Sequence, residues 1–258
     1  MRIYSWNMLY RNAELERAFD FVSEADFDIF CLQEVPEVFL EKLKARPFHI
    51  ASHKEADVEH AGVRFPIYTV TLSRFPITGS KAIVLPPYVQ PLRGKLAAGI
   101  LYTLRLWGHA VDQRRFSSMT DIDQDGRSLR IFNLHLRLAY PALRLREFEE
   151  AMTERDPELP TIVCGDFNIV ESPRVSLLNW LLGGKATDTL FYTRERSHIE
   201  RRFVEHSLTN VMRGKVTHGL SRSQLDHILV SHAFRVQDAS VLSDRCGSDH
   251  HPIRIETT

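Results

Sequence analysis

The chain has 258 residues, and its 33 basic residues balance its 33 acidic residues, so the formal net charge is zero. Hydrophobic residues make up 43% and charged residues 26%, which is typical of an ordinary globular protein and excludes a disordered one. The balanced charge argues against a strongly electrostatic nucleic-acid binder, although it does not exclude a local basic groove.

Short apolar segments rich in β-branched and aromatic residues recur along the chain, and each has the length of a strand. In chain order, the predicted strands cover residues 2–6, 28–32, 67–72, 82–85, 97–104, 129–136, 161–164, 225–230, 234–242 and 252–255. Helical spacing lies between them at 13–25, with Asn12 available as the N-cap, at 141–155, and from Ser172-Pro173 to Gly183-Gly184. Loops or irregular insertions are expected at 48–66, 86–96, 105–118 and 184–224.

The strands outnumber the helices and do not alternate strictly with them. This order predicts an α+β protein, a four-layer αββα sandwich in which two mostly antiparallel sheets pack face to face with helices outside. No low-complexity tract, repeat or flexible linker divides the chain, so we expect one domain over residues 1–258.

Cysteines and apolar segments indicate the compartment. The three cysteines are widely spaced and odd in number, which excludes a disulfide framework and disfavours a thiolate zinc site. No segment approaches the roughly 20 apolar residues that span a bilayer, and the first ten residues lack the apolar core of a signal peptide. We expect a cytoplasmic monomer with no transmembrane segment and no obligate protein partner.

Polar side chains stand at six predicted strand ends, where an unpaired polar group would be costly to bury. They are Asn7, Glu34, His135 (with Asn133 on the same face), Asp166 with Asn168, Asp226 with His227, and Asp249 with His250. One such residue would carry little information, but six indicate a single site assembled from the ends of two sheets.

The residue types in this set favour a hard metal ion. Carboxylate and amide oxygens prefer Mg²⁺ or Mn²⁺, and Mg²⁺ usually completes its shell with water and substrate phosphate. Three histidines could instead hold Zn²⁺, but no H-x-x-x-H or H-x-H spacing supports that. A hard metal beside a His–Asp pair and an Asp–Asn pair is suited to hydrolysis of a phosphate ester.

With these residues in place, the sequence resembles the endonuclease/exonuclease/phosphatase superfamily, the proteins with the DNase-I-like fold. The resemblance rests on motifs in the family's order that span nearly the whole chain: SWN (5–7), LQE (32–34), LSRFPI (72–77), NLHL (133–136), GDFN (165–168), LDHILVS (225–231) and SDHHPI (248–253). The complete ordered set is far more specific than any one motif.

The resemblance implies roles for individual residues. Glu34 would be the principal metal carboxylate, with Asn7 contributing its amide oxygen and Asp249 a further carboxylate on the metal side. Asp166 would activate water, with Asn168 fixing it and contacting phosphate. His250, oriented by Asp226, would face the scissile phosphate, and His135 would donate to a non-bridging oxygen. Arg74 is a weaker candidate for a phosphate contact, because the family varies at that position.

Each of these residues also has a plain structural explanation. Asn7 could form a turn, Glu34 could lie at the start of a helix beginning at Pro36, and Asp166 with Asn168 could build an Asx-turn. His135 could be a core histidine. His227 points away from Asp226 along the strand and is interpreted as structural, and His250 is preferred to His251 because it follows Ser248-Asp249 directly.

The implied function is a Mg²⁺- or Mn²⁺-dependent phosphodiesterase that uses direct water attack, with a nuclease acting on DNA or RNA as the first choice. The alternative is a phospholipid, sphingomyelin or inositol-phosphate hydrolase, and a non-catalytic binding module on the same fold is a third hypothesis. A basic trench at the site would indicate a polynucleotide, and a small pocket would indicate a soluble phosphate ester.

Overall fold

The computed structural model describes residues 1–103, 109–110, 115–138 and 140–258. The strands are β1 (Arg2–Asn7), β2 (Ile29–Pro36), β3 (His49–His60), β4 (Val63–Ser73), β5 (Ile77–Val84), β6 (His109–Ala110), β7 (Phe116–Gln124), β8 (Arg127–His135), β9 (Thr161–Asp166), β10 (Leu208–Asn210), β11 (Asp226–Ser231), β12 (Val236–Val241) and β13 (Ile253–Thr257). The helices are α1 (Leu15–Glu24), α2 (Glu37–Lys44), α3 (Leu92–Thr103), α4 (Pro141–Met152), α5 (Pro173–Leu181), α6 (Ala186–Leu190) and α7 (Arg194–Glu205).

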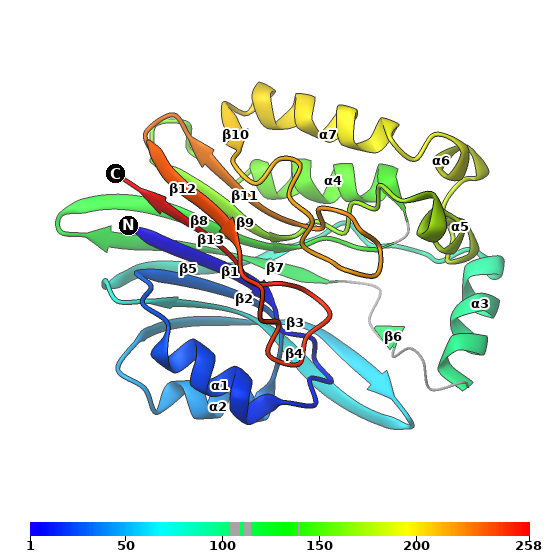
Figure 1. The fold of residues 1–258 in the computed structure, drawn as a ribbon, viewed down its shortest axis with the longest axis horizontal. Coiled ribbons are helices and arrows are strands. Elements are labelled where there is room, and N and C mark those ends of the chain that lie inside the picture. The colour runs from blue at the N-terminus through cyan, green and yellow to red at the C-terminus, as the bar shows by residue number, and fades with distance from the viewer. Residues whose placement is uncertain (104–108, 111–114, 139) are drawn as a thin grey trace.

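These strands form two sheets packed face to face, in the orders β12-β13-β1-β2-β4-β3-β6 and β10-β11-β9-β8-β7-β5. The pairs β1·β2 and β8·β9 are parallel, and the other pairs are antiparallel. Helices α1 and α2 cover the first sheet, and α4 and α7 cover the second, so the predicted αββα sandwich is confirmed (Figure 1).

Strand alternation builds three apolar layers from one sequence pattern. In β1, Ile3 faces the second sheet, whereas Tyr4 and Trp6 pack toward α1 and α2. The buried layer between the sheets is made mostly of isoleucine, with two cysteines, whereas the two outer layers also contain buried aromatic residues. Among the described helices, none has the length and apolar character needed to cross a bilayer.

Several local predictions were wrong. The strand predicted at 97–104 is wrong: residues 97–103 belong to helix α3, and residue 104 lies outside the described residues. A short apolar run does not distinguish a strand from a helix, and alanine and leucine are good helix formers. The expected loop 48–66 forms the β3–β4 hairpin, whose charged residues hid the strand pattern. The expected loop 184–224 contains α6, α7 and β10. Much of 105–118, including Trp107, lies outside the described residues, and its end begins β7.

The helices at 13–25, 141–155 and after Ser172-Pro173 are confirmed as α1, α4 and α5. Asn12, however, does not cap α1. Its amide nitrogen donates to the backbone oxygens of Met8 and Cys246, 2.9 Å away in each case, so it ties the chain after β1 to the loop before β13.

Candidate active site

Strand direction brings the predicted residues together at the end of the sandwich opposite the two chain termini (Figure 1). Because β1 and β2 are parallel neighbours, Asn7 and Glu34 lie at the same edge of the first sheet. In the second sheet, the parallel pairing of β8 and β9 sets His135 beside Asp166. The antiparallel strand β11 begins where β9 ends, so Asp226 lies opposite Asp166.

His250 reaches this edge on the loop before β13. The Ser248 hydroxyl donates to the backbone oxygen of Asn7 (2.8 Å) and accepts the backbone N–H of His250 (3.0 Å). The Trp6 indole nitrogen donates to the His250 backbone oxygen at 3.2 Å. These bonds hold the loop against the end of β1.

Glu34 enters the site through a break in the pleat of β2. Leu32, two residues earlier, packs toward the outer helices, and simple alternation would send Glu34 the same way. Instead, the pairing of β2 with β4 shifts register between Leu32 and Val35, and Glu34 has a φ of 55°. This bulge turns the carboxylate toward Asn7, a strained geometry of the kind that functional sites retain.

Asp166 is fixed by the turn that follows β9. Gly165 has a φ of +136°, and a Cβ there would lie 1.8 Å from the Leu134 backbone oxygen, so only glycine allows this approach of β9 to β8. Asp166 Oδ1 accepts the Asn168 backbone N–H at 2.8 Å, which is the Asx-turn considered above. Because Oδ1 makes the turn, Oδ2 is left for the site.

The amide of Asn7 links the two carboxylates. Its nitrogen donates to Glu34 Oε1 at 3.1 Å and to Asp166 Oδ2 at 3.0 Å, while its oxygen accepts the Leu9 backbone N–H at 3.0 Å. The nitrogen therefore faces the carboxylates, which differs from the oxygen-first orientation expected for a metal ligand. Asn168 also donates to Asp166 Oδ2, at 3.2 Å.

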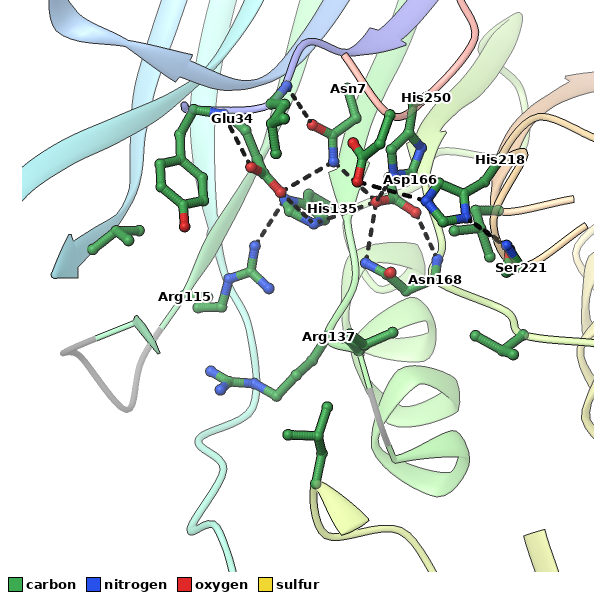
Figure 2. Close-up of a pocket in the computed structure, with 18 of the residues that line it drawn as sticks. Asn7, Glu34, Arg115, His135, Arg137, Asp166, Asn168, His218, Ser221 and His250 are labelled. Atoms are coloured by element: carbon green, nitrogen blue, oxygen red, sulfur yellow. Dashed lines mark hydrogen bonds and ion pairs between the residues drawn. The ribbon is translucent and has the colours of Figure 1, made fainter. Parts of the chain in front are cut away.

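Two imidazoles converge on the same carboxylate oxygen (Figure 2). The Nε2 atoms of His135 and His250 lie 3.5 and 3.7 Å from Asp166 Oδ2. Each ring is held through Nδ1 by a buried carboxylate: Asp226 lies 2.8 Å from His250, and Glu55 lies 2.7 Å from His135. Both Nε2 atoms are thereby directed into the site.

The pKa values follow this arrangement of charges. Burial lowers the pKa of His250, but Asp226 and Asp166 outweigh it and raise the pKa to about 10. Burial likewise opposes a charged His135, and Glu55 reverses the direction and raises the His135 pKa. Burial raises the pKa of Glu34, because the positive charge of His135 does not offset the cost of removing this carboxylate from water. The pKa of Glu55 falls to about 2, because His135 and Arg115 overcome the effect of burial.

Glu55 was not predicted from the sequence, and no site role was predicted for Arg115. Glu55 is fully buried in β3 and forms an ion pair with Arg115, which precedes β7. In the sequence, Glu55 lies between Lys54 and Ala56 in a charged segment without apolar alternation, so nothing local distinguishes it. Its partners come from β8 and from the start of β7, and only folding brings them together.

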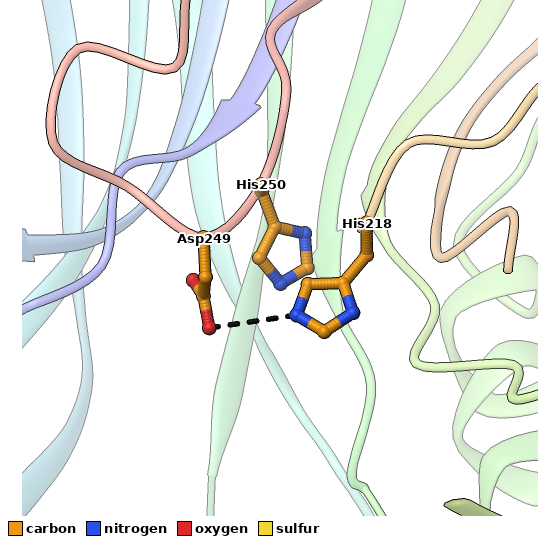
Figure 3. Close-up of side chains that lie close together, drawn as sticks. All are labelled: His218, Asp249 and His250. Carbon is orange, nitrogen blue, oxygen red and sulfur yellow. Dashed lines mark ion pairs between the residues drawn. The ribbon is translucent and has the colours of Figure 1, made fainter. Parts of the chain in front are cut away.

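His218, from the loop after β10, was also missed (Figure 3). Its ring centroid lies 4.9 Å from that of His250, and its Nε2 lies 3.6 Å from Asp249 Oδ2. The Ser221 backbone N–H donates to His218 Nδ1 at 3.2 Å, so Nε2 carries the proton of the neutral ring. Asp249 therefore faces His218, and both side chains lie next to the His250 ring (Figure 3).

Arg74 is not brought to this site. Its Nε donates to the Phe27 backbone oxygen at 2.7 Å, and its guanidinium lies 5.2 Å from the centre of the Phe27 ring. Phe27 precedes β2, whereas Glu34 is near its end, about 20 Å along an extended chain. A phosphate bound at the Asp166 cluster would be out of reach of Arg74, so this structure does not support the predicted contact between Arg74 and phosphate.

A cavity of about 460 Å³ opens over the cluster, with the predicted residues other than Asp226 and Arg74 in its lining (Figure 2). Its walls come from the β3–β4 hairpin, α3, α5 and the loop carrying His218, and they add apolar side chains such as Val58, Val175 and Leu220. Volumes of this size are typical of small-molecule sites. Among the described residues, the arginines that line the cavity are Arg11, Arg115 and Arg137.

The donor set fits a hard divalent cation. Among the described residues, two groups bring possible ligand atoms within 4.8 Å of one another: Asp166, Asp226 and His250, and His218, Asp249 and His250. The buried Asp226 Oδ1 and Asp249 Oδ1 have no hydrogen-bond partner among the described residues. Together with the partly buried carboxylate of Glu34, these oxygens supply the negative charge that such an ion requires.

Comparisons with known proteins agree with this fold. A model of the endonuclease/exonuclease/phosphatase family matches residues 4–250, so the chain belongs to that family. Its members are hydrolases that act on phosphoester bonds and generally use divalent metal ions. A search of curated proteins finds no match.

Solved structures with the same fold differ in substrate. A family protein from Leptotrichia buccalis is 14% identical with a TM-score of 0.68, over 100% of this chain and 99% of that one. A mannosyl-6-phosphatase from Bacteroides thetaiotaomicron is 18% identical with a TM-score of 0.63, over 100% and 99%. A 3′ phosphatase from Neisseria, bound to a product DNA hairpin, is 16% identical with a TM-score of 0.59, over 100% and 99%. At these identities the likeness concerns the fold alone.

Proposed function

We propose that the chain is a divalent-metal-dependent phosphoesterase that hydrolyses its substrate by direct attack of water, with no covalent enzyme intermediate. The observation that carries the proposal is the convergence of His135 Nε2 and His250 Nε2 on Asp166 Oδ2, beside Glu34, on the floor of the cavity. A phosphate seated there would meet two imidazole donors and a carboxylate poised to act on water.

Asp166 orients the attacking water and accepts its proton, and the amides of Asn7 and Asn168 hold this carboxylate in place. His135 and His250 donate from Nε2 to phosphate oxygens, where negative charge accumulates in the transition state. Glu55 and Asp226 fix the two rings from behind and keep them protonated.

Glu34 is the carboxylate proposed to hold the cation, and Asp249 and His218 form a second possible cation site. When bound, a Mg²⁺ or Mn²⁺ ion supplies Lewis-acid neutralisation of the phosphate. Asn7 would contribute an oxygen ligand only if its amide turned over, since its nitrogen now faces Glu34.

The walls of the cavity favour a substrate that enters a pocket. A small phosphate ester, a phospholipid headgroup or the end of a single strand fits a space of about 460 Å³, whereas the interior of a duplex needs an open groove. The net charge of zero supports the same preference. If the substrate is a nucleic acid, we therefore propose cleavage at the end of a single strand and not internal cleavage of duplex DNA.

The proposal is tested with chelator-treated protein and bis-p-nitrophenyl phosphate, with Mg²⁺, Mn²⁺ or EDTA present. We expect metal-dependent release of p-nitrophenol that EDTA abolishes, and no release would support a binding module instead. Sugar and inositol phosphates, phospholipid, a single-stranded oligonucleotide and supercoiled plasmid are then compared by kcat/KM. Nicking of the plasmid at a higher kcat/KM than the small esters would reject the pocket-entry proposal.

A further inference from the structure

One wall of the cavity carries a cation that the mechanism does not use. Arg137 follows β8 and lies two residues after His135, so both side chains face the cavity (Figure 2). The Arg137 guanidinium stacks over the ring of Tyr88, with its carbon 5.2 Å from the ring centre. Tyr88 lines the same cavity and precedes α3.

Among the described residues, no carboxylate lies within ion-pair distance of the Arg137 guanidinium, and its Nε is buried without a hydrogen-bond partner. The nearby Glu147 accepts the backbone N–H of Arg137 at 2.7 Å and not its side chain. Burial, together with repulsion from Arg115, lowers the pKa of Arg137 to about 10, so the group is still charged at neutral pH. The Tyr88 hydroxyl is also buried, with no hydrogen-bond partner in the part of the chain that the structure describes.

Two buried arginines, in contrast to Arg137, each have a carboxylate partner. Arg144 is fully buried and donates to both carboxylate oxygens of Glu195, at 2.6 and 2.5 Å. Arg115 is paired with Glu55. A buried charge is costly without a counter-charge, and Arg144 and Arg115 each have a carboxylate for this purpose. At Arg137 the position that a carboxylate would occupy faces the cavity instead.

We propose that Arg137, together with the Tyr88 hydroxyl, binds a second anionic group of the substrate while the scissile phosphate lies between His135 and His250. The inference rests on the proposed function for the placement of the scissile phosphate. The substrate class is thereby narrowed to phosphoesters with a second phosphate, on a nucleotide or on a sugar-like polyol. The planar guanidinium fork suits such a group, and the tyrosine adds a hydroxyl donor.

The test measures binding by isothermal titration calorimetry in EDTA, with intact probe verified by a phosphate-release assay. One arm compares thymidine 5′-monophosphate with thymidine 3′,5′-bisphosphate, and the other compares fructose 6-phosphate with fructose 1,6-bisphosphate. The variants are Arg137→Met and Arg137→Lys, and the matched control is Arg146→Met on the exposed face of α4. Circular dichroism and melting temperature verify folding, and Arg137→Met should melt no lower than wild type because it removes an unpaired buried cation.

In the wild-type protein, a bisphosphate should bind about tenfold more tightly than its monophosphate, the size of effect expected from one charged hydrogen bond. That preference should be nearly lost in Arg137→Met, partly kept in Arg137→Lys and unchanged in Arg146→Met. A preference in one arm alone identifies the source of the second phosphate. No preference in either arm, or an equal preference in Arg137→Met, would overturn the inference.

The two proposals fail separately in these experiments. A chain that hydrolyses no phosphoester but loses the bisphosphate preference in Arg137→Met would remove the proposed function and keep the anion subsite. If the protein hydrolyses monophosphates and Arg137→Met keeps the bisphosphate preference, the proposed function stands and the anion subsite is rejected.

Discussion

The Nδ1 atom of His135 lies 2.7 Å from Oε1 of Glu55, and this pair repeats, from the other side of Asp166, the pair that His250 makes with Asp226 at 2.8 Å. The two pairs are not related in sequence. Glu55 comes from a charged edge hairpin and Asp226 from a buried strand, yet each holds one ring so that its Nε2 faces the same oxygen.

This symmetry makes Glu55→Gln informative. The amide oxygen of glutamine can still accept the Nδ1–H hydrogen bond, but it carries no negative charge, so His135 should lose its raised pKa and be held less firmly. We expect kcat for bis-p-nitrophenyl phosphate to fall ~10- to 100-fold, with a smaller change in KM, and the alkaline limb of the pH profile to move to lower pH. Asp57→Asn, on the same strand but paired with exposed Lys54 and Arg64, is the control. A pH profile that Glu55→Gln leaves in place would contradict the role of Glu55.

Asp166 and His250 should matter most for turnover. Asp166→Asn removes the group that accepts the proton of water, and His250→Ala removes a transition-state donor, so each should lower kcat at least ~100-fold. His251→Ala changes the neighbouring histidine, whose Nδ1 bonds the Leu242 backbone oxygen outside the cavity, and should keep near-native kcat. If His251→Ala and His250→Ala were equally impaired, the choice between the two histidines would fail.

Glu34→Gln tests the metal site. The substitution keeps the shape of the side chain in its bulge but removes the negative charge that attracts the cation. We expect the Mg²⁺ concentration for half-maximal activity to rise at least ~10-fold, with activity partly restored at high Mg²⁺. Glu37→Gln, at the start of α2, is the matched control. An unshifted Mg²⁺ titration would reject Glu34 as a ligand.

Substitution of His227 should change the free energy of unfolding and leave catalysis unchanged. It is fully buried against Phe167 and Phe203, and burial, with the nearby Arg196, lowers its pKa well below 6.5. The unfolded chain therefore takes up this proton first as the pH falls, so its contribution to stability is complete above pH 6.5 and decreases below it.

Between about pH 7.5 and about pH 5.5, this group should cost the wild-type protein about 1 kcal/mol of unfolding free energy. His227→Gln has no titrating ring, so urea denaturation should show a smaller loss over the same interval. His232→Gln, at an exposed histidine, should keep the wild-type loss. Equal pH dependence in His227→Gln and wild type would contradict a buried neutral imidazole.

The cluster could be predicted from the sequence because each member stands at a strand end. A polar residue that closes an apolar strand is visible in the local pattern, and the strands that carry Asn7, Glu34, His135 and Asp166 are parallel in pairs, so their ends meet. The ordered family motifs then assigned roles to residues that the strand-end pattern alone could not distinguish. The same logic failed for Arg74, whose motif follows β4 at the opposite end of β2.

The sequence by itself determined the sandwich, the family and the residues at the strand ends, because alternation and strand order are local properties of the chain. Only the tertiary structure decided that Glu55 supports His135, that His218 lies against His250, and that Arg137 faces the cavity with no carboxylate partner among the described residues. These relationships join segments far apart in the chain through side-chain burial and charge, and such energies exist only once the two sheets, their hairpin and their loops have closed around one cavity.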